Sequence, residues 1–276
     1  MARRNTTHLQ LRLRLRPRHA LGRTLRHRNA LLRRWPRPLR RTSRQGHHRH
    51  HQRLHLPPQP RLDAPSLRHR PGIKTMILST RTIQSFLDDL AAKSPTPGGG
   101  AVASIVGALS AALAQMVLAY SRNKKSLAQH ADLHDSSLQR LDHARELLLQ
   151  LAHDDQDAYA NLNNLLRLPE DDPERTRQIL PAAQQATQVP LAVMATCAEL
   201  LRLFHQLAPA SNRSLLSDLA ISAILAEATV RAAAWNVRAN LPILAQHNAD
   251  AGVREEMQRI VAPLPQLLAE IEQACA

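Results

Sequence analysis

Residues 95–120, PTPGGGAVASIVGALSAALAQMVLAY, decide the fold of this chain. The prolines and glycines prevent regular structure before Ala101, and an almost wholly apolar run follows as far as Tyr120. This run is long enough to span a membrane, but it consists mainly of Ala, Gly and Ser, contains Gln115, and has no second uninterrupted counterpart in the chain. It therefore predicts a helix that is buried in a protein core.

Small residues recur along one face of this predicted helix. Ala103, Gly107 and Ala111 stand at positions i, i+4 and i+8, which places them on one side of an α-helix. A face without large side chains lets a neighbouring helix approach closely, so we expect close helix packing here.

The flanking sequence predicts further helices and no strand. A stripe of Ile83, Phe86, Leu87 and Leu90 indicates a helix before the glycines. Apolar residues at helical spacing continue from Leu138 to Leu166. Further stretches follow at about 173–207, with internal breaks or kinks at Pro181 and Pro190, from about Ser217, and at about 251–274. The expected fold is an all-α bundle of about five to six helices, preceded by a disordered basic segment.

Charge divides the chain into two parts. Residues 1–75 hold 21 basic and 1 acidic residue, a net charge of +20, whereas residues 76–276 hold 16 basic and 21 acidic residues, a net charge of −5. The first part is rich in Arg, His and Pro and lacks Val, Phe and Glu, so it cannot build a core. We expect residues 1–75 to be a low-complexity segment that is disordered or not translated, and residues 76–276 to be one helical domain.

Several interpretations of the basic segment remain open. Its charge suits salt-sensitive binding of nucleic acid or a membrane surface, its Arg excess suits a targeting peptide, and its composition suits a reading frame that is not translated before Met76. A nucleic-acid partner is therefore expected only if residues 1–75 are present. The cysteines Cys197 and Cys275 form no disulfide or zinc pattern, which favours the cytoplasm.

The domain from about residue 83 to 270 resembles a known family. The ordered motifs that carry the resemblance are Phe86-Leu87, the loop 95–100, Asn123-Lys124-Lys125, Asp155-x-x-Ala158-Tyr159, Arg167-Leu168-Pro169, Val189-Pro190-Leu191, Ser217-Asp218-Leu219 and Asn236-Val237-x-x-Asn240-Leu241. This set is similar to the formimidoyltetrahydrofolate cyclodeaminase and methenyltetrahydrofolate cyclohydrolase family.

The resemblance implies a helical bundle that assembles as a homodimer or a higher homo-oligomer, with a tetrahydrofolate derivative as substrate and no metal or organic cofactor. No membrane partner is expected, because the composition of residues 101–120 predicts a buried helix. The resemblance implies cyclisation of 5-formiminotetrahydrofolate to 5,10-methenyltetrahydrofolate with release of ammonia, or hydrolysis of that same methenyl cation. A different class stays open, namely a non-catalytic helical protein with a nucleic-acid-binding basic arm.

Both folate reactions need a carboxylate near a delocalised cation and a group that moves protons. Asp155 and Tyr159 stand at i and i+4 and share a helix face. Spacing alone favours a solvated acidic face made with Asp154 and Asp157, but the family motif selects Asp155 as a catalytic residue and Tyr159 as a substrate-binding one. Asp218 is the second catalytic candidate. Alternatively, Asp218 only stabilises the start of a helix, as acidic residues in the first turn do.

Asn236 and Asn240 are also spaced i, i+4, so their amides can offer paired donors and acceptors to a heterocycle, or else cap a helix. Asp218 lies 18 residues before Asn236, about five turns and about 27 Å along a straight helix. If both residues bind folate, either the helix is broken between them or a second subunit brings Asp218 to the site.

The remaining candidates suit the acidic tail of a folate. Gly98, Gly99 and Gly100 precede a helix, where exposed N–H groups can hold a carboxylate, although the same glycines also allow close packing. Lys124 and Lys125 can attract the glutamate tail, or can belong to an ordinary exposed loop.

Overall fold

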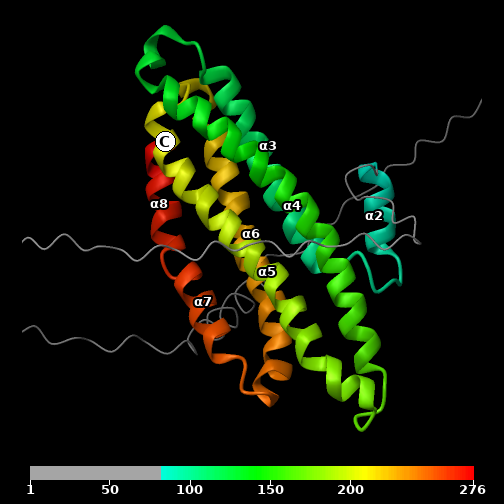
Figure 1. The fold of residues 1–276 in the computed structure, drawn as a ribbon. Coiled ribbons are helices and arrows are strands. Elements are labelled where there is room, and N and C mark those ends of the chain that lie inside the picture. Colours follow the sequence, from blue (N-terminus) through cyan, green and yellow to red (C-terminus); the bar gives the residue numbers. More distant parts are fainter. Residues whose placement is uncertain (1–81) are drawn as a thin grey trace, which may run out of the picture. The chain divides into compact units, whose positions relative to one another are not determined.

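The computed structural model describes residues 82–276, and the expectations for residues 1–75 lie outside this range. Within it the chain is helical, without a strand, which confirms the predicted all-α class. Four long helices pack together as a bundle in Figure 1: α3 (Gly99–Ser121), α4 (Ala131–Leu166), α5 (Pro173–Leu207) and α6 (Leu216–Gln246). Short 3-10 turns, Lys125–His130, Ala208–Ala210 and Arg213–Leu215, connect them.

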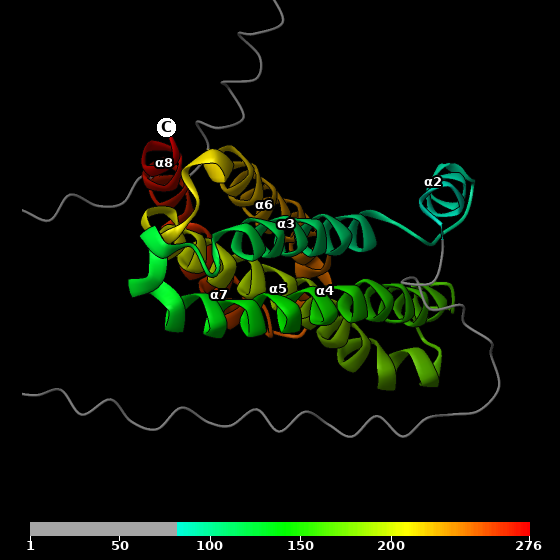
Figure 2. The ribbon, with the colours of Figure 1, turned by 90° about the horizontal axis from the view of Figure 1, so that it is seen from above.

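The small face of α3 is buried, as predicted. Ala103 and Ala111 are at most 2% exposed. A Cβ atom added at Gly107 would lie 2.8 Å from the Cys197 sulfur atom and 3.2 Å from Thr229 Cγ2. Gly107 therefore lets α5 and α6 approach α3, and Figure 2 shows these helices side by side.

Within residues 82–276, two helices are long and apolar enough to cross a membrane by length and composition, namely α3 and the stretch from Pro173 to Ala210. In each, 56% of the most apolar window is buried inside the bundle. A core helix of a helical bundle passes the same test, so this finding agrees with the core position expected for α3.

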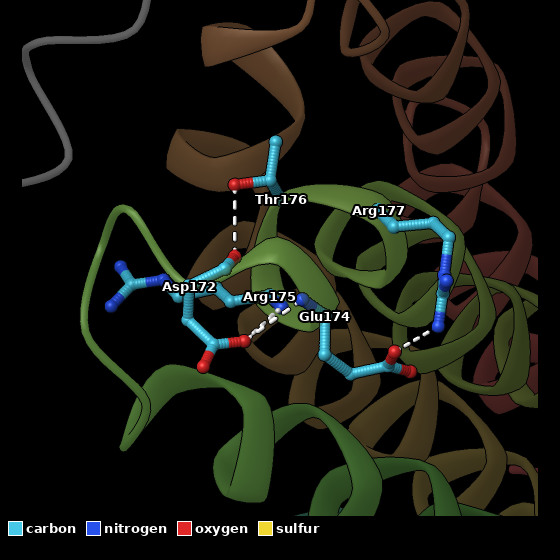
Figure 3. A network of polar contacts seen from close by, with 5 residues as sticks. All are labelled: Asp172, Glu174, Arg175, Thr176 and Arg177. Atoms are coloured by element: carbon cyan, nitrogen blue, oxygen red, sulfur yellow. Dashed lines mark hydrogen bonds and ion pairs between the residues drawn. The ribbon is translucent and has the colours of Figure 1, made fainter.

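The start of α5 has a complete N-terminal cap (Figure 3). Asp172 Oδ1 accepts hydrogen bonds from the backbone N–H groups of Glu174 at 2.8 Å and Arg175 at 3.1 Å. Thr176 Oγ1 donates to the Asp172 carbonyl at 3.0 Å, and Arg177 pairs with Glu174. With Pro173 in the first turn, these contacts explain why the helix begins here.

Prolines act differently in the middle and at the end of the chain. α5 continues through Pro181 and Pro190, whereas the single helix predicted over about 251–274 is two helices, α7 (Ala251–Val261) and α8 (Leu264–Cys275). Pro263 and Pro265 lack the N–H groups that would continue the ladder of α7, so the helix ends before them.

The short helix α2 (Ile83–Ala91) precedes the glycines, as the apolar stripe predicts. Thr82 Oγ1 accepts a hydrogen bond from Ser85 N at 3.1 Å and caps it. None of its residues is buried, and Phe86 packs against the small cluster formed by Ala101 and Ala152.

Helices α3 and α6 run antiparallel, which gives the bundle two distinct ends. Gly99 faces Asn236, the Ser110 hydroxyl donates to the Ser222 carbonyl at 2.7 Å, and the Ser121 hydroxyl accepts from Asn212 N at 2.8 Å. We call these the Gly99 end, where α3 begins, and the Ser121 end, where α3 stops.

Candidate active site

A cavity of about 290 Å³ opens at the Gly99 end. The loop before α3 and the helices α3, α4, α5 and α6 all contribute to its wall. Its lining residues are Pro95, Thr96, Gly98, Gly99, Gly100, Asp155, Tyr159, Ala186, Asn236, Ala239 and Asn240. Most of the predicted site residues therefore meet here, although the sequence separates Gly98 from Asn240 by more than half the chain.

Asp155 lies against the first turn of α3. Its carboxylate accepts a hydrogen bond from the backbone N–H of Ala101, and a Cβ atom added at Gly100 would overlap that carboxylate. Burial raises the pKa of Asp155 from 3.8 to about 6, and the Ala101 hydrogen bond opposes this rise. A carboxyl group with such a pKa can both accept and return a proton near neutral pH.

Asn236 contributes an amide nitrogen to the cavity that has no hydrogen-bond partner among the described residues. Its Nδ2 atom is buried and has no hydrogen-bond partner among the described residues. Its Oδ1 atom lies 3.6 Å from the position of a Cβ atom at Gly99, so the amide stands beside the start of α3. Because an unpaired buried donor costs free energy, this amide is suited to an acceptor atom of a ligand.

Asn240 is held by α5. Its Nδ2 atom donates to the carbonyl of Ala186 at 3.0 Å. That carbonyl precedes Pro190 by four residues, and proline has no N–H to bond it within the helix. The hydrogen bond therefore satisfies a carbonyl freed by Pro190 and fixes the amide at the cavity wall.

Tyr159 lies one turn after Asp155 on α4 and lines the same cavity with 46% of its surface exposed. The shared face predicted from the i, i+4 spacing is thus present. Sequence reasoning missed Ala186, Thr96, Pro95 and Ala239 as wall residues. Only the position of Pro190, four residues after Ala186, carried a signal for the first of them.

The other predicted residues lie at the Ser121 end. Asp218 stands in the first turn of α6, and Lys124 and Lys125 follow the end of α3. α6 is unbroken between Asp218 and Asn236, so these residues are about 27 Å apart in one chain. One chain alone does not bring Asp218 into the cavity.

A second cavity of about 440 Å³ lies beside α5 and α7. Its wall consists of Gln184, Thr187, Gln188, Leu244, Ala249, Gly252 and Val253. None of these side chains titrates near neutral pH, so the smaller cavity, which contains Asp155, is the one equipped for proton transfer.

No group of three His, Cys, Asp or Glu side chains in residues 82–276 is placed to hold a metal ion. His134 is 1% exposed, and its Nε2 atom lies 2.8 Å from the Ala210 carbonyl. Cys197 is fully buried, and burial raises the pKa of its thiol to about 12, so it is not a nucleophile near neutral pH.

Comparison with known proteins identifies the family of this chain. The sequence profile of the family described as Formiminotransferase-cyclodeaminase matches residues 82–259. The methenyltetrahydrofolate cyclohydrolase of Methylorubrum extorquens is 37% identical over 164 residues, which cover 58% of this chain and 78% of that protein. The formimidoyltransferase-cyclodeaminase of Rattus norvegicus is 35% identical over 170 residues, but the match covers only 30% of its length.

A solved structure has the same fold. The formiminotetrahydrofolate cyclodeaminase of Thermotoga maritima superposes with a TM-score of 0.67 and 27% sequence identity, covering 71% of this chain and 96% of that one. The resemblance predicted from the ordered motifs is confirmed. The chain belongs to the formiminotransferase-cyclodeaminase family.

Proposed function

We propose that this chain is a folate-dependent one-carbon enzyme that cyclises 5-formiminotetrahydrofolate to 5,10-methenyltetrahydrofolate and releases ammonia. Family membership and the cavity at the Gly99 end support this assignment. The observation that carries it is that one cavity holds both a carboxyl group whose pKa is about 6, that of Asp155, and the Asn236 Nδ2 atom, which has no partner among the described residues.

Asp155 moves the proton in this reaction. Folate N10 attacks the carbon of the protonated formimino group, and the Asp155 carboxylate accepts the N10 proton. The same proton then passes to the amino group, which leaves as ammonia while the N5–C–N10 unit becomes the methenyl cation. The carboxylate, once ionised again, stabilises that cation.

The two asparagines orient the heterocycle. Asn236 Nδ2 donates to an acceptor of the pterin, since nothing in the described residues occupies it. Asn240 Nδ2 is committed to Ala186, which leaves its Oδ1 atom to accept a hydrogen bond. Tyr159, one turn after Asp155 on α4, lines the same cavity and binds the substrate.

A second candidate is methenyltetrahydrofolate cyclohydrolase activity. The bacterial relative named for that reaction is 37% identical to this chain and is covered over 78% of its length. In this reaction Asp155 would accept a proton from the water that attacks the methenyl carbon, so the same cavity serves both reactions.

One absorbance experiment separates the two activities. The full 276-residue chain is mixed with formiminotetrahydrofolate in one cuvette and with methenyltetrahydrofolate in another, and the methenyl absorbance is followed. Cyclodeamination predicts growth in the first cuvette, and hydrolysis predicts accelerated loss in the second. If neither rate exceeds that of the Asp155→Asn chain, the proposed function is wrong.

The assembly, cofactor and location belong to the same proposal. The enzyme acts as a homodimer or a higher homo-oligomer, needs no metal or organic cofactor, and works in the cytoplasm. The apolar outer face of α6 supports the assembly, because Trp235 is 71% exposed on it.

A further inference from the structure

An apolar stripe runs along the outer face of α6. Ile221, Ile224 and Trp235 are 46%, 43% and 71% exposed. The exposed alanines at positions 228, 232 and 239 lie between and beyond them at steps of three or four residues, which keeps the whole stripe on one side of the helix. On the neighbouring helix α3, Leu109 is also exposed, at 55%.

The stripe is nearly symmetric about Ala228, so that its residues pair with those of a second, antiparallel copy. Ile221 precedes Ala228 by seven residues and Trp235 follows it by seven, while Ile224 and Ala232 stand four residues to either side. An antiparallel copy therefore pairs Ile221 with Trp235 and Ile224 with Ala232, and two alanines meet at the centre. Small residues at the crossing let the two helices approach closely.

This antiparallel pairing determines the position of Asp218 of the partner subunit. Asp218 and Asn236 lie on the same flank of the stripe, since they are about five whole turns apart. They are ten and eight residues from Ala228. In an antiparallel pair, a two-fold axis through Ala228 places this flank of both helices on the same side of the pair. Measured along the helix axis, Asp218 of the partner subunit then lies within about 3 Å of Asn236.

On the basis of the proposed function, we propose that a second copy of this chain docks on the α6 stripe and that its Asp218 completes the cavity beside Asn236. The pterin edge presents an N–H and an amino group side by side, which a carboxylate accepts as a bidentate pair. Asp218 of the partner subunit anchors the pterin there, while Asp155 of the first subunit moves the proton. The unbroken α6 excludes the same contact within one chain.

Mixed dimers test the arrangement. Full chains carrying Asp218→Ala and Asn236→Ala are each expected to lose activity, with KM raised about 10- to 100-fold. After unfolding together and refolding, half the dimers are mixed and each of these has one intact cavity, so activity returns to about a quarter of the wild-type value.

The matched control is a mixed dimer of an Asp155→Asn chain and an Asn236→Ala chain. The structure places these two residues in one cavity of one chain, so mixing leaves every cavity damaged and no activity returns. The proposal is overturned if the Asp218 and Asn236 pair also fails to recover, or if Asp218→Ala alone leaves KM unchanged. An active wild-type enzyme with no recovery rejects only this inference, whereas an inactive wild-type enzyme rejects the proposed function.

The stripe is tested separately with Ala228→Arg, which places a charge at the proposed crossing. Light scattering is expected to show a monomer with native helical circular dichroism and no activity. Ala195→Arg, at an exposed position of α5, is the control and stays dimeric and active. A fully active Ala228→Arg chain, monomeric or dimeric, contradicts the proposal, and if this variant unfolds, the mixed dimers decide.

Discussion

The two ends of the bundle contain similar polar residues but use them differently. At the Ser121 end Arg122 meets Asp135 at 2.9 Å, and His134 Nε2 lies 2.8 Å from the Ala210 carbonyl. The buried hydroxyls of Ser137 and Ser211 also lie at this end without a partner among the described residues, but they line neither of the two cavities described above. At the Gly99 end the Asn236 Nδ2 atom has no partner in the described part of the chain, and burial raises the pKa of Asp155. Satisfied polar groups stabilise a fold, whereas groups left unsatisfied around a cavity are available for a ligand.

Replacing Asp155 with Asn should give the largest effect at the Gly99 end. We expect kcat to fall by about 10²- to 10⁴-fold, because the amide cannot accept and return the proton. Steady-state kinetics on both folate substrates measure this loss. Asp154→Asn, one residue away and hydrogen-bonded only to Gln150 on the same helix, is the control and should retain wild-type kcat.

The raised pKa of Asp155 also predicts how stability depends on pH. Below pH 3.8 the Asp155 carboxyl group is protonated in both the folded and the unfolded chain, so it does not lower the free energy of unfolding. As the pH rises from 3.8 to about 6, the unfolded chain ionises first, and the free energy of unfolding falls by at most about 3 kcal/mol.

Urea denaturation of wild-type and Asp155→Asn chains at several pH values measures this effect. The Asn variant lacks the ionisation, so it should gain stability relative to the wild type above pH 6 and lose that advantage below pH 4. If the stability difference between the two chains does not vary with pH, burial does not raise the pKa of Asp155.

The glycines at the start of α3 allow a comparison of two substitutions within the Gly99 end. Gly100→Ala should destabilise the fold by about 1–3 kcal/mol and reduce activity, because the new Cβ atom overlaps the Asp155 carboxylate. At Gly98 a Cβ atom would meet only the Pro95 carbonyl at 4.0 Å, so Gly98→Ala is the matched control. Thermal melts and kcat of the pair test this, and equal effects would contradict the contact.

The smallest effect is expected at the Ser121 end. Lys124→Ala combined with Lys125→Ala should leave kcat unchanged and raise KM for a polyglutamylated folate a few-fold at low salt, since both lysines are exposed and exposed charges are screened. The monoglutamate is the control substrate. An equal change in KM for both substrates would show that the lysines do not bind the tail.

Much of the fold could be predicted from local sequence. The small face at Ala103, Gly107 and Ala111 and the break that begins at Pro95 are local patterns, and both are present, although α3 begins at Gly99 and not, as predicted, at Ala101. The split between α7 and α8 was missed because Pro263 follows an apolar pattern that continues beyond it. Kinks or internal breaks were predicted at Pro181 and Pro190, and α5 is not broken there, because packing against the neighbouring helices keeps it continuous.

The candidate site could be predicted only in part. Motifs identified Asp155, Asn236 and Asn240, but their environments depend on contacts between distant segments, such as Asp155 on Gly100 and Asn240 on Ala186. No local pattern reports a contact across 50 or more residues. Helical geometry alone did predict that Asp218 and Asn236 are too far apart to share a cavity in one chain, and the unbroken α6 agrees.

A crystal structure of the full chain with bound tetrahydrofolate tests the central claim most directly. The pterin is expected in the cavity at the Gly99 end, with Asn236 Nδ2 donating to it and the Asp155 carboxylate beside the N5–N10 region. A pterin held instead in the cavity of Gln184 and Thr187, with Asn236 Nδ2 still unpartnered, would contradict the assignment of this site.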